Sequence, residues 1–397
     1  MQYRSVLLCL LVPFAAASAE EIPAPATRAG FNPDISLILA GGYAGLSNDP
    51  DNYRLPGFML GSETTPGPRG LALGESELVI TANVDDLFTG RFTAAITPEN
   101  TVAVEEAYVE TLGLVQGATL RAGRFLSGVG YLNNQHPHAW DFADTALPYR
   151  ALLANRYGDD GVQLRWVAPT DLFVELGGEW FRGENFPAGG AGNNGQGAAS
   201  LFVHAGGDVG AEHAWRAGLS ALRSKPVGRL SGAIDTTPDA FSGESRVVVA
   251  DLVWKWAANG NPKDRHFKFQ AEAMRRTEDG VFTADVNGIN GAPVADVFSS
   301  IQCGWYVQAV WQFMPRWRVG ARYDTVRTRE LSAGANAVLF DALGHTPRRS
   351  SVMFDYARSE FSRLRLQLTH DRSQPDAGSE VLVQYIMSLG AHGAHAF

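Results

Sequence analysis

The segment IQCGWYVQAVWQF occupies residues 301–313, and RWRVGARYD follows at residues 316–324 after a turn that contains Pro315. Every second position of both segments is apolar, and most of the positions between are polar or glycine. Side chains of a β-strand alternate between its two faces, so this period of two predicts two strands with one apolar and one polar face. The short turn between them predicts an antiparallel hairpin.

The same alternation recurs along the chain, and we predict about sixteen strands. They lie near residues 33–45, 76–85, 91–97, 101–111, 118–126, 161–168, 171–181, 199–206, 213–222, 246–257, 265–276, 300–313, 316–327, 350–358, 361–370 and 380–389. Aromatic residues such as Trp180, Trp254 and Trp317 lie towards strand ends on the apolar face. Short turns alternate with long loops, and the last residue is Phe397. These features predict an all-β protein, a single transmembrane antiparallel β-barrel with long outer loops.

The composition agrees with a barrel and excludes other classes. Of the 397 residues, 19% are charged and 45% are hydrophobic, which excludes a disordered chain. No apolar run after the N-terminus is long enough for a membrane-spanning helix. The formal net charge of -9 gives no support for nucleic-acid binding.

The N-terminus has the pattern of an export signal. Arg4 precedes an apolar stretch at residues 6–17, and the small residues Ala17 and Ala19 form a cleavage motif. We therefore predict a cleaved signal peptide at 1–19, a short periplasmic segment at 20–32 and a barrel at 33–397. The expected location is the outer membrane.

Two stretches resemble known families. The strand LRAGRF at 120–125, followed by YLNNQHPH at 131–138, resembles the fifth strand and third loop of the phosphate-selective porin O and P superfamily. The end of the chain, QYIMSLGAHGAHAF at 384–397, resembles proteobacterial outer-membrane proteins labelled as zinc-regulated TonB-dependent receptors. The resemblance implies a Gram-negative porin whose third loop folds into the lumen and narrows it. It also implies regulation by zinc and assembly as a homotrimer.

The sequence departs from both families. The chain has only four lysines, fewer than phosphate selectivity implies, and the first strand begins too early for a TonB plug domain to precede it. We therefore expect passive diffusion of small polar or charged solutes. Expected partners are these solutes, membrane lipid, lipopolysaccharide and, through Phe397, the barrel-assembly machinery.

Strand parity predicts which charged side chains line the pore. They are Arg121, Arg165, Arg318, Arg322, Arg363, Arg365, Glu175, Glu179 and Asp355. We expect Arg318, Arg322, Arg363 and Arg365 to form a basic wall, and the acidic residues Asp141, Asp144, Asp159 and Asp160 to face it across a constriction. His136 and His138 of the third loop are expected to help shape this constriction. A transverse field between the two would orient polar solutes. The alternative is that these charges only hydrate and pair within the lumen.

Histidines suggest a second function. His136 and His138 in the third loop, and His392 and His395 near the end, are candidate ligands for zinc or another divalent metal. The alternative function is therefore uptake of a transition metal or its chelate, with the metal as solute and no resident cofactor. No GxSxG motif is present, so we predict that the protein is not an enzyme, although a non-conducting structural or enzymatic barrel stays open.

Overall fold

The computed structural model describes residues 33–62, 64–97, 101–190, 194–231, 238–342 and 344–390. The strands are β1 (Asp34–Leu46), β2 (Gly70–Leu73), β3 (Ser76–Asn83), β4 (Phe88–Ile96), β5 (Val102–Thr111), β6 (Ala118–Leu126), β7 (Gly158–Val167), β8 (Phe173–Phe181), β9 (Ala198–Val209), β10 (His213–Ser224), β11 (Arg229–Ser231), β12 (Asp239–Ala257), β13 (His266–Ala284), β14 (Val294–Met314), β15 (Trp317–Ser332), β16 (Arg348–Ser359), β17 (Ser362–Arg372) and β18 (Gly378–Gly390). The helical turns are η1 (Pro50–Asn52), η2 (Pro137–Ala139), α1 (Leu147–Leu153), η4 (Ala258–Gly260) and η5 (Gly334–Phe340).

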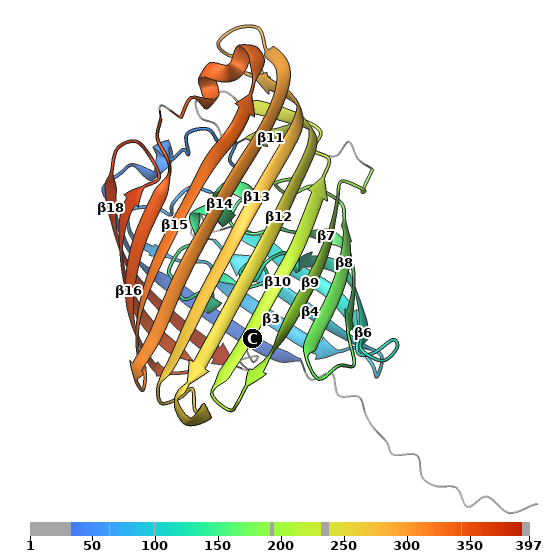
Figure 1. Cartoon of the computed structure of the whole chain (residues 1–397), viewed down its shortest axis with the longest axis vertical. Coiled ribbons are helices and arrows are strands. Elements are labelled where there is room, and N and C mark those ends of the chain that lie inside the picture. The colour runs from blue at the N-terminus through green and yellow to red at the C-terminus, as the bar shows by residue number, and fades with distance from the viewer. Residues whose placement is uncertain are drawn as a thin grey trace, which may run out of the picture. The chain divides into compact units, whose positions relative to one another are not determined.

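The strands form one closed antiparallel barrel. Consecutive strands pair, and β1 pairs with β18 from Ser36–Gly390 to Leu46–Glu380, which closes the sheet (Figure 1). Both β2 and β3 pair with β1, so together they occupy one strand position of the barrel, with an interruption between them. Strand β11 pairs with the end of β12, beyond the stretch that pairs with β10. When β2 and β3 are counted as one strand and β11 is not counted separately, the described part of the chain forms a barrel of sixteen strands. This confirms the predicted barrel.

Four neighbouring strands, β12 to β15, are longer than predicted. They have 19, 19, 21 and 16 residues and extend into segments that we expected to be loops, near 224–244, 277–298 and 328–348. The alternation between the two faces continues there, but large apolar residues lie on both faces. Phe241, Phe282 and Phe298 point inward and are buried, whereas Val281 and Val297 point outward and are exposed. These inward phenylalanines pack with Met59 and Phe340 in an apolar cluster inside the barrel.

The segment between β6 and β7, residues 127–157, lies inside the barrel, as predicted for the third loop; we call it loop 3. It contains η2 and α1, and every residue of α1 is buried. Helix α1 contacts β13, β14 and β15. None of the helices in the described residues is long and apolar enough to cross a membrane.

Loop 3 packs with the loop between β1 and β2, residues 47–69, which we call the first loop. Leu55 and Phe58 of the first loop share one apolar cluster with Val129 and Leu147 of loop 3. Each of these side chains is at most 2% exposed, so they fill the barrel interior around them. The packing divides the lumen into a filled part and a cavity that loop 3 borders.

Candidate functional site

A cavity of about 1080 Å³ lies between loop 3 and the short turns at one end of the barrel. Tyr131, His136 and Asp141 of loop 3 border it on one side. Gly210 and Pro262, both in short turns between strands, border it at the other end. The cavity therefore extends from the barrel's turn end to loop 3.

Some of the predicted pore-lining residues border this cavity, and others do not. The predicted residues at the cavity are Arg121, Arg165, Arg318, Arg363, Glu175, His136, His138 and Asp141. The others with described positions, Arg322, Arg365, Glu179, Asp355 and Asp144, do not border it. For Arg322, Arg365, Glu179 and Asp355 this corrects the prediction that they line the pore. These four side chains are buried in contacts with loop 3 or with a neighbouring strand.

The acidic residues of loop 3 bind the basic wall directly. Asp144 accepts hydrogen bonds from Arg322 at 2.7 Å and from Arg349 at 2.5 Å. Asp141 lies 3.0 Å from the Lys268 ammonium and 3.1 Å from the Arg318 guanidinium. The prediction that these acids face the arginines across a constriction is therefore wrong, because the opposite charges are in contact.

Burial and charge oppose each other at these two carboxylates. Burial alone would raise the pKa of Asp144, but Arg322 and Arg349 outweigh it and hold the pKa below its usual range. For Asp141, burial is likewise outweighed by Lys268 and Arg318, and its pKa is also lowered. Both groups are therefore charged near neutral pH.

Buried carboxylates of the wall hold the backbone of loop 3. Glu272 accepts the N–H groups of Tyr131 at 2.9 Å and Leu132 at 3.1 Å, and the Tyr149 hydroxyl at 2.7 Å. Glu179 accepts the N–H of Gly128 at 2.9 Å. Because these acceptors are fixed on strands, they set the position of the loop. This contact explains why Glu179 is covered.

Charged side chains of β16 and β17 are also covered because they take part in contacts that hold loop 3. Arg365 donates to the carbonyl of Trp140 in loop 3 at 2.8 Å. Asp355 accepts two hydrogen bonds from Arg318, the longer of them 2.9 Å. Arg365 therefore binds loop 3 directly, and Asp355 holds Arg318, which binds Asp141 of loop 3.

The histidines of loop 3 lie against glutamates of the opposite wall. His136 Nδ1 is 3.0 Å from Glu105 Oε2 and 3.2 Å from Glu77 Oε2, and its Nε2 is 2.9 Å from Glu106 Oε2. His138 Nδ1 is 3.0 Å from Glu77 Oε1. We call these five residues the His–Glu cluster.

A β-bulge places two consecutive glutamates on the same side of β5. The pairing with β4 shifts between Thr93–Glu106 and Ala94–Val104, so Glu105 is the extra residue. Both Glu105 and Glu106 therefore reach His136, which regular alternation would prevent. Sequence reasoning missed these two glutamates, and the signal was available because two adjacent charges interrupt the period of two.

Charge at His136 is strongly favoured. Burial alone would lower the pKa of this imidazole, but Glu77, Glu105 and Glu106 outweigh burial and raise the pKa well above its ordinary value. A positive charge at this position, whether a proton or another cation, is therefore stabilised. The other two predicted histidine ligands, His392 and His395, lie outside the described residues, as does Phe397.

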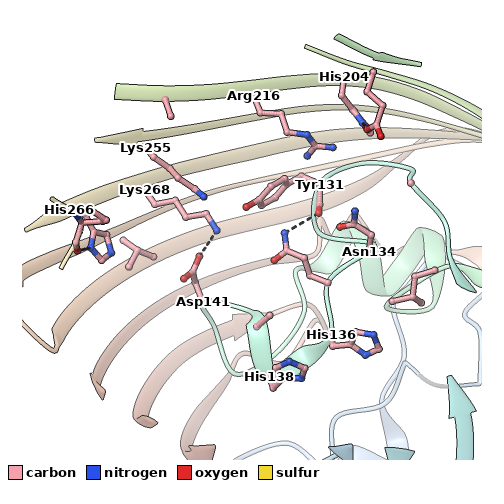
Figure 2. A pocket seen from close by; sticks show the side chains of 18 of the residues that line it. Tyr131, Asn134, His136, His138, Asp141, His204, Arg216, Lys255, His266 and Lys268 are labelled. Atoms are coloured by element: carbon pink, nitrogen blue, oxygen red, sulfur yellow. Dashed lines mark hydrogen bonds and ion pairs between the residues drawn. The ribbon is translucent and has the colours of Figure 1, made fainter. Parts of the chain in front are cut away.

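The wall opposite the His–Glu cluster presents cations to the cavity. Arg216 on β10, Lys255 on β12 and Lys268 on β13 extend from neighbouring strands towards Tyr131 and Asp141 of loop 3 (Figure 2). Lys268 binds Asp141, and Arg216 lies 3.7 Å from Asp251. Three neighbouring strands thus each place a basic group at this side of the cavity.

Solved structures with a similar fold are outer-membrane proteins. The chain superposes on the loop-deleted OmpT outer-membrane protein of Vibrio cholerae with a TM-score of 0.55 at 13% identity, covering 90% of this chain and 99% of that one. It superposes with TM-scores of 0.53 on an anion-selective porin of Comamonas acidovorans, at 12% identity (90% and 99% covered), and on the outer-membrane channel DcaP of Acinetobacter baumannii, at 11% identity (91% and 99% covered). The chain is a β-barrel with the fold of outer-membrane porins.

Sequence similarity then identifies a family. No family model matches the chain. A protein of Aquifex aeolicus (strain VF5), described as uncharacterized, is 30% identical over 401 residues, covering 94% of this chain and 81% of that protein. The chain belongs to the same family as this Aquifex protein.

Proposed function

We propose that the protein is an outer-membrane channel through which small polar and charged solutes diffuse passively, after export with a cleaved signal at residues 1–19. The observation that carries this proposal is the charged cavity between the turn end and loop 3. A porin fold with a polar, water-accessible lumen provides a path for solutes and requires no catalytic chemistry.

Passage beyond loop 3 depends on movement of the inner loops. Phe58, Val129 and Leu147 have almost no exposed surface, so the described packing closes the lumen around them. We propose that the first loop or loop 3 shifts to admit a solute. Conductance should therefore be small and interrupted by closures.

We propose a preference for anions. The basic groups at the cavity are Arg91, Arg121, Arg165, Arg216, Lys255, Lys268, Arg318 and Arg363, and the acidic groups are Asp34, Glu106, Asp141, Glu175, Asp208 and Glu212. Eight cations against six anions, with the excess on the wall that carries Lys255, favours negative solutes. The fold resemblance to an anion-selective porin agrees with this preference but does not carry it.

The test is single-channel recording of the purified full-length protein in a planar bilayer under a potassium chloride gradient. We expect conductance with a reversal potential of the sign for anion preference. Silence from protein whose folding is confirmed by circular dichroism would overturn the channel. A reversal potential of the opposite sign would overturn only the anion preference.

One observation favours a second candidate, uptake of zinc or another transition metal. The His–Glu cluster offers nitrogen and oxygen ligands at the cavity, where His136 and His138 border it. Uptake predicts that Zn²⁺ crosses a vesicle membrane containing the protein faster than Mg²⁺ does. Equal rates would leave the general channel as the function.

The expected partners are proposals on the same basis. A homotrimer, contacts of the outer loops with lipopolysaccharide, and recognition of Phe397 by the barrel-assembly machinery agree with a porin fold. Cross-linking in native outer membranes tests the trimer, and only monomers would overturn it.

A further inference from the structure

We propose that Glu77, Glu105 and His136 bind one divalent transition-metal ion of the zinc class and thereby fasten loop 3 to β3 and β5. The inference concerns a resident ion. It holds whether or not the channel conducts, because it rests on the geometry of the His–Glu cluster.

The spacing of the three donor atoms suits a small cation. Nδ1 of His136, one oxygen of Glu77 and one oxygen of Glu105 all lie within 4.8 Å of one another. Ligands of a tetrahedral ion with bonds of about 2.0 Å are about 3.3 Å apart. The distances of 3.0 Å and 3.2 Å from Nδ1 to the two carboxylates are close to this value.

A proton alone leaves this arrangement incomplete. Nδ1 carries at most one hydrogen, and it is directed to Glu105 Oε2 at 3.0 Å. Glu77 is fully buried, and its Oε2, 3.2 Å from the same Nδ1, has no hydrogen-bond donor of its own among the described residues. A buried carboxylate oxygen without a donor is costly, and a cation between the three groups would satisfy it.

Neighbouring groups orient the three ligands as in known metal sites. Nε2 of His136 lies 2.9 Å from Glu106, which leaves Nδ1 free of its proton for a metal when Nε2–H donates to that carboxylate. Arg156 donates to the other oxygen of Glu105 at 2.6 Å. His138 holds the second oxygen of Glu77 at 3.0 Å.

The charge around the site requires a cation. Four carboxylates meet here, those of Glu75, Glu77, Glu105 and Glu106. They contact two guanidinium groups, Arg91 on Glu106 at 3.0 Å and Arg156 on Glu75 and Glu105. With His136 neutral, the carboxylates outnumber the guanidinium groups that they contact, although burial raises the pKa of Glu75 to about 7. A cation between Glu77, Glu105 and His136 is therefore stabilised.

The ligand types and the access route favour a zinc-class ion. Imidazole nitrogen with two carboxylates suits Zn²⁺ and its neighbours in the transition series, whereas Ca²⁺ and Mg²⁺ prefer oxygen ligands throughout. Glu106, His136 and His138 border the cavity. An ion entering from the turn end therefore reaches the site.

The test measures Zn²⁺ binding to the purified full-length protein after chelation and dialysis, by calorimetry and by metal analysis. We expect one Zn²⁺ per chain. His136→Gln and Glu77→Gln should each weaken binding at least tenfold, and Glu106→Gln should weaken it by about 10- to 100-fold through loss of orientation.

The matched control is His204→Gln. His204 also borders the cavity and pairs with a carboxylate, Glu175 at 3.0 Å, but among the described residues it belongs to no group of three donor atoms that all lie within 4.8 Å of one another. It should leave Zn²⁺ binding unchanged. Circular dichroism confirms that each variant is folded, and the visible spectrum of Co²⁺ bound to the wild type provides a readout that does not depend on variants.

Absence of stoichiometric Zn²⁺, or equal binding by wild type and folded His136→Gln, would overturn the proposal and leave a protonated histidine among glutamates. Conductance in the same preparations is measured separately. A conducting protein without Zn²⁺ would therefore overturn only this inference, and a silent protein with Zn²⁺ would overturn only the channel.

Discussion

Loop 3 is attached to two parts of the barrel wall by opposite charge arrangements. On one wall, Asp144 lies 2.7 Å from Arg322 and 2.5 Å from Arg349, and Arg150 of α1, also in loop 3, lies 3.5 Å from it. On the other wall, His136 lies among three glutamates. Arginine is always charged, so the aspartate attachment is complete at neutral pH. The histidine attachment needs a cation on the loop, either a proton or a metal ion.

The largest effect is expected from breaking the aspartate attachment. Asp144→Asn would remove one counter-ion from the buried Arg322 and Arg349, which keep Asp324 and Glu380 as partners. The cost should therefore lie below the about 3–5 kcal/mol of a buried pair that loses its partner outright. We expect faster amide exchange in 147–153, lower thermal stability and larger conductance. Hydrogen exchange, thermal unfolding and bilayer recording measure these changes.

The matched control for that variant is Glu244→Gln. Glu244 also pairs with an arginine, Arg223, at 2.5 Å, but both side chains are largely exposed. Exposed pairs contribute about 0–1 kcal/mol, so little change is expected. If both variants lowered stability equally, burial would not be what distinguishes the aspartate attachment.

Removal of metal tests the histidine attachment and should have the next largest effect. An ion that binds only the folded state stabilises it by about 2.7 kcal/mol when its free concentration is 100 times Kd. Adding a chelator should therefore lower the melting temperature of the wild type. The melting temperature of His136→Gln should not respond, and an equal response would show that the metal acts elsewhere.

Acid should release the aspartate attachment only at low pH. The pKa values of Asp141 and Asp144 are lowered in the folded protein, so their stabilisation is present above the ordinary carboxyl pKa and is lost as pH falls through the lower folded values. Amide exchange of α1 should thus stay slow at pH 5 and accelerate in stronger acid. The double variant Asp141→Asn, Asp144→Asn should lose this dependence. Acceleration already at pH 5 would contradict it.

The smallest effect concerns Lys255, one of the basic groups at the cavity. Lys255→Gln removes one charge from the lining and should shift the reversal potential slightly towards zero, because it is one of fourteen charged Arg, Lys, Asp and Glu groups that border the cavity. Lys225→Gln, at an exposed position away from the cavity, should not shift it. Equal shifts would show that overall charge, not the lining, sets the preference.

The barrel could be predicted from the sequence because the period of two is local. Each of the sixteen barrel strands has a predicted counterpart, including those at 301–313 and 316–324. The outer ends of β12 to β15 were missed because Phe241, Phe282 and Phe298 point inward. Because apolar residues also lie on the outward face, as Val281 and Val297 do, the contrast between an apolar and a polar face on which the prediction depended is lost there.

The site could be predicted only in part, because its contacts join distant segments. Parity places side chains on the inner face, but it does not show which of them loop 3 covers. Asp144 reaches Arg349, 205 positions away. The bulge at Glu105 depends on pairing between β4 and β5, which alternation within one strand does not show.

The order of assembly follows from these long separations. Loop 3 contacts Glu272 through Tyr149, 123 positions later, and Gln367 through Asp144, 223 positions later. Its apolar residues therefore have no complete binding surface until the last third of the chain has joined the sheet. Docking of loop 3 is a late step of folding, and the nascent barrel must carry an undocked segment of some thirty residues until its final strands arrive.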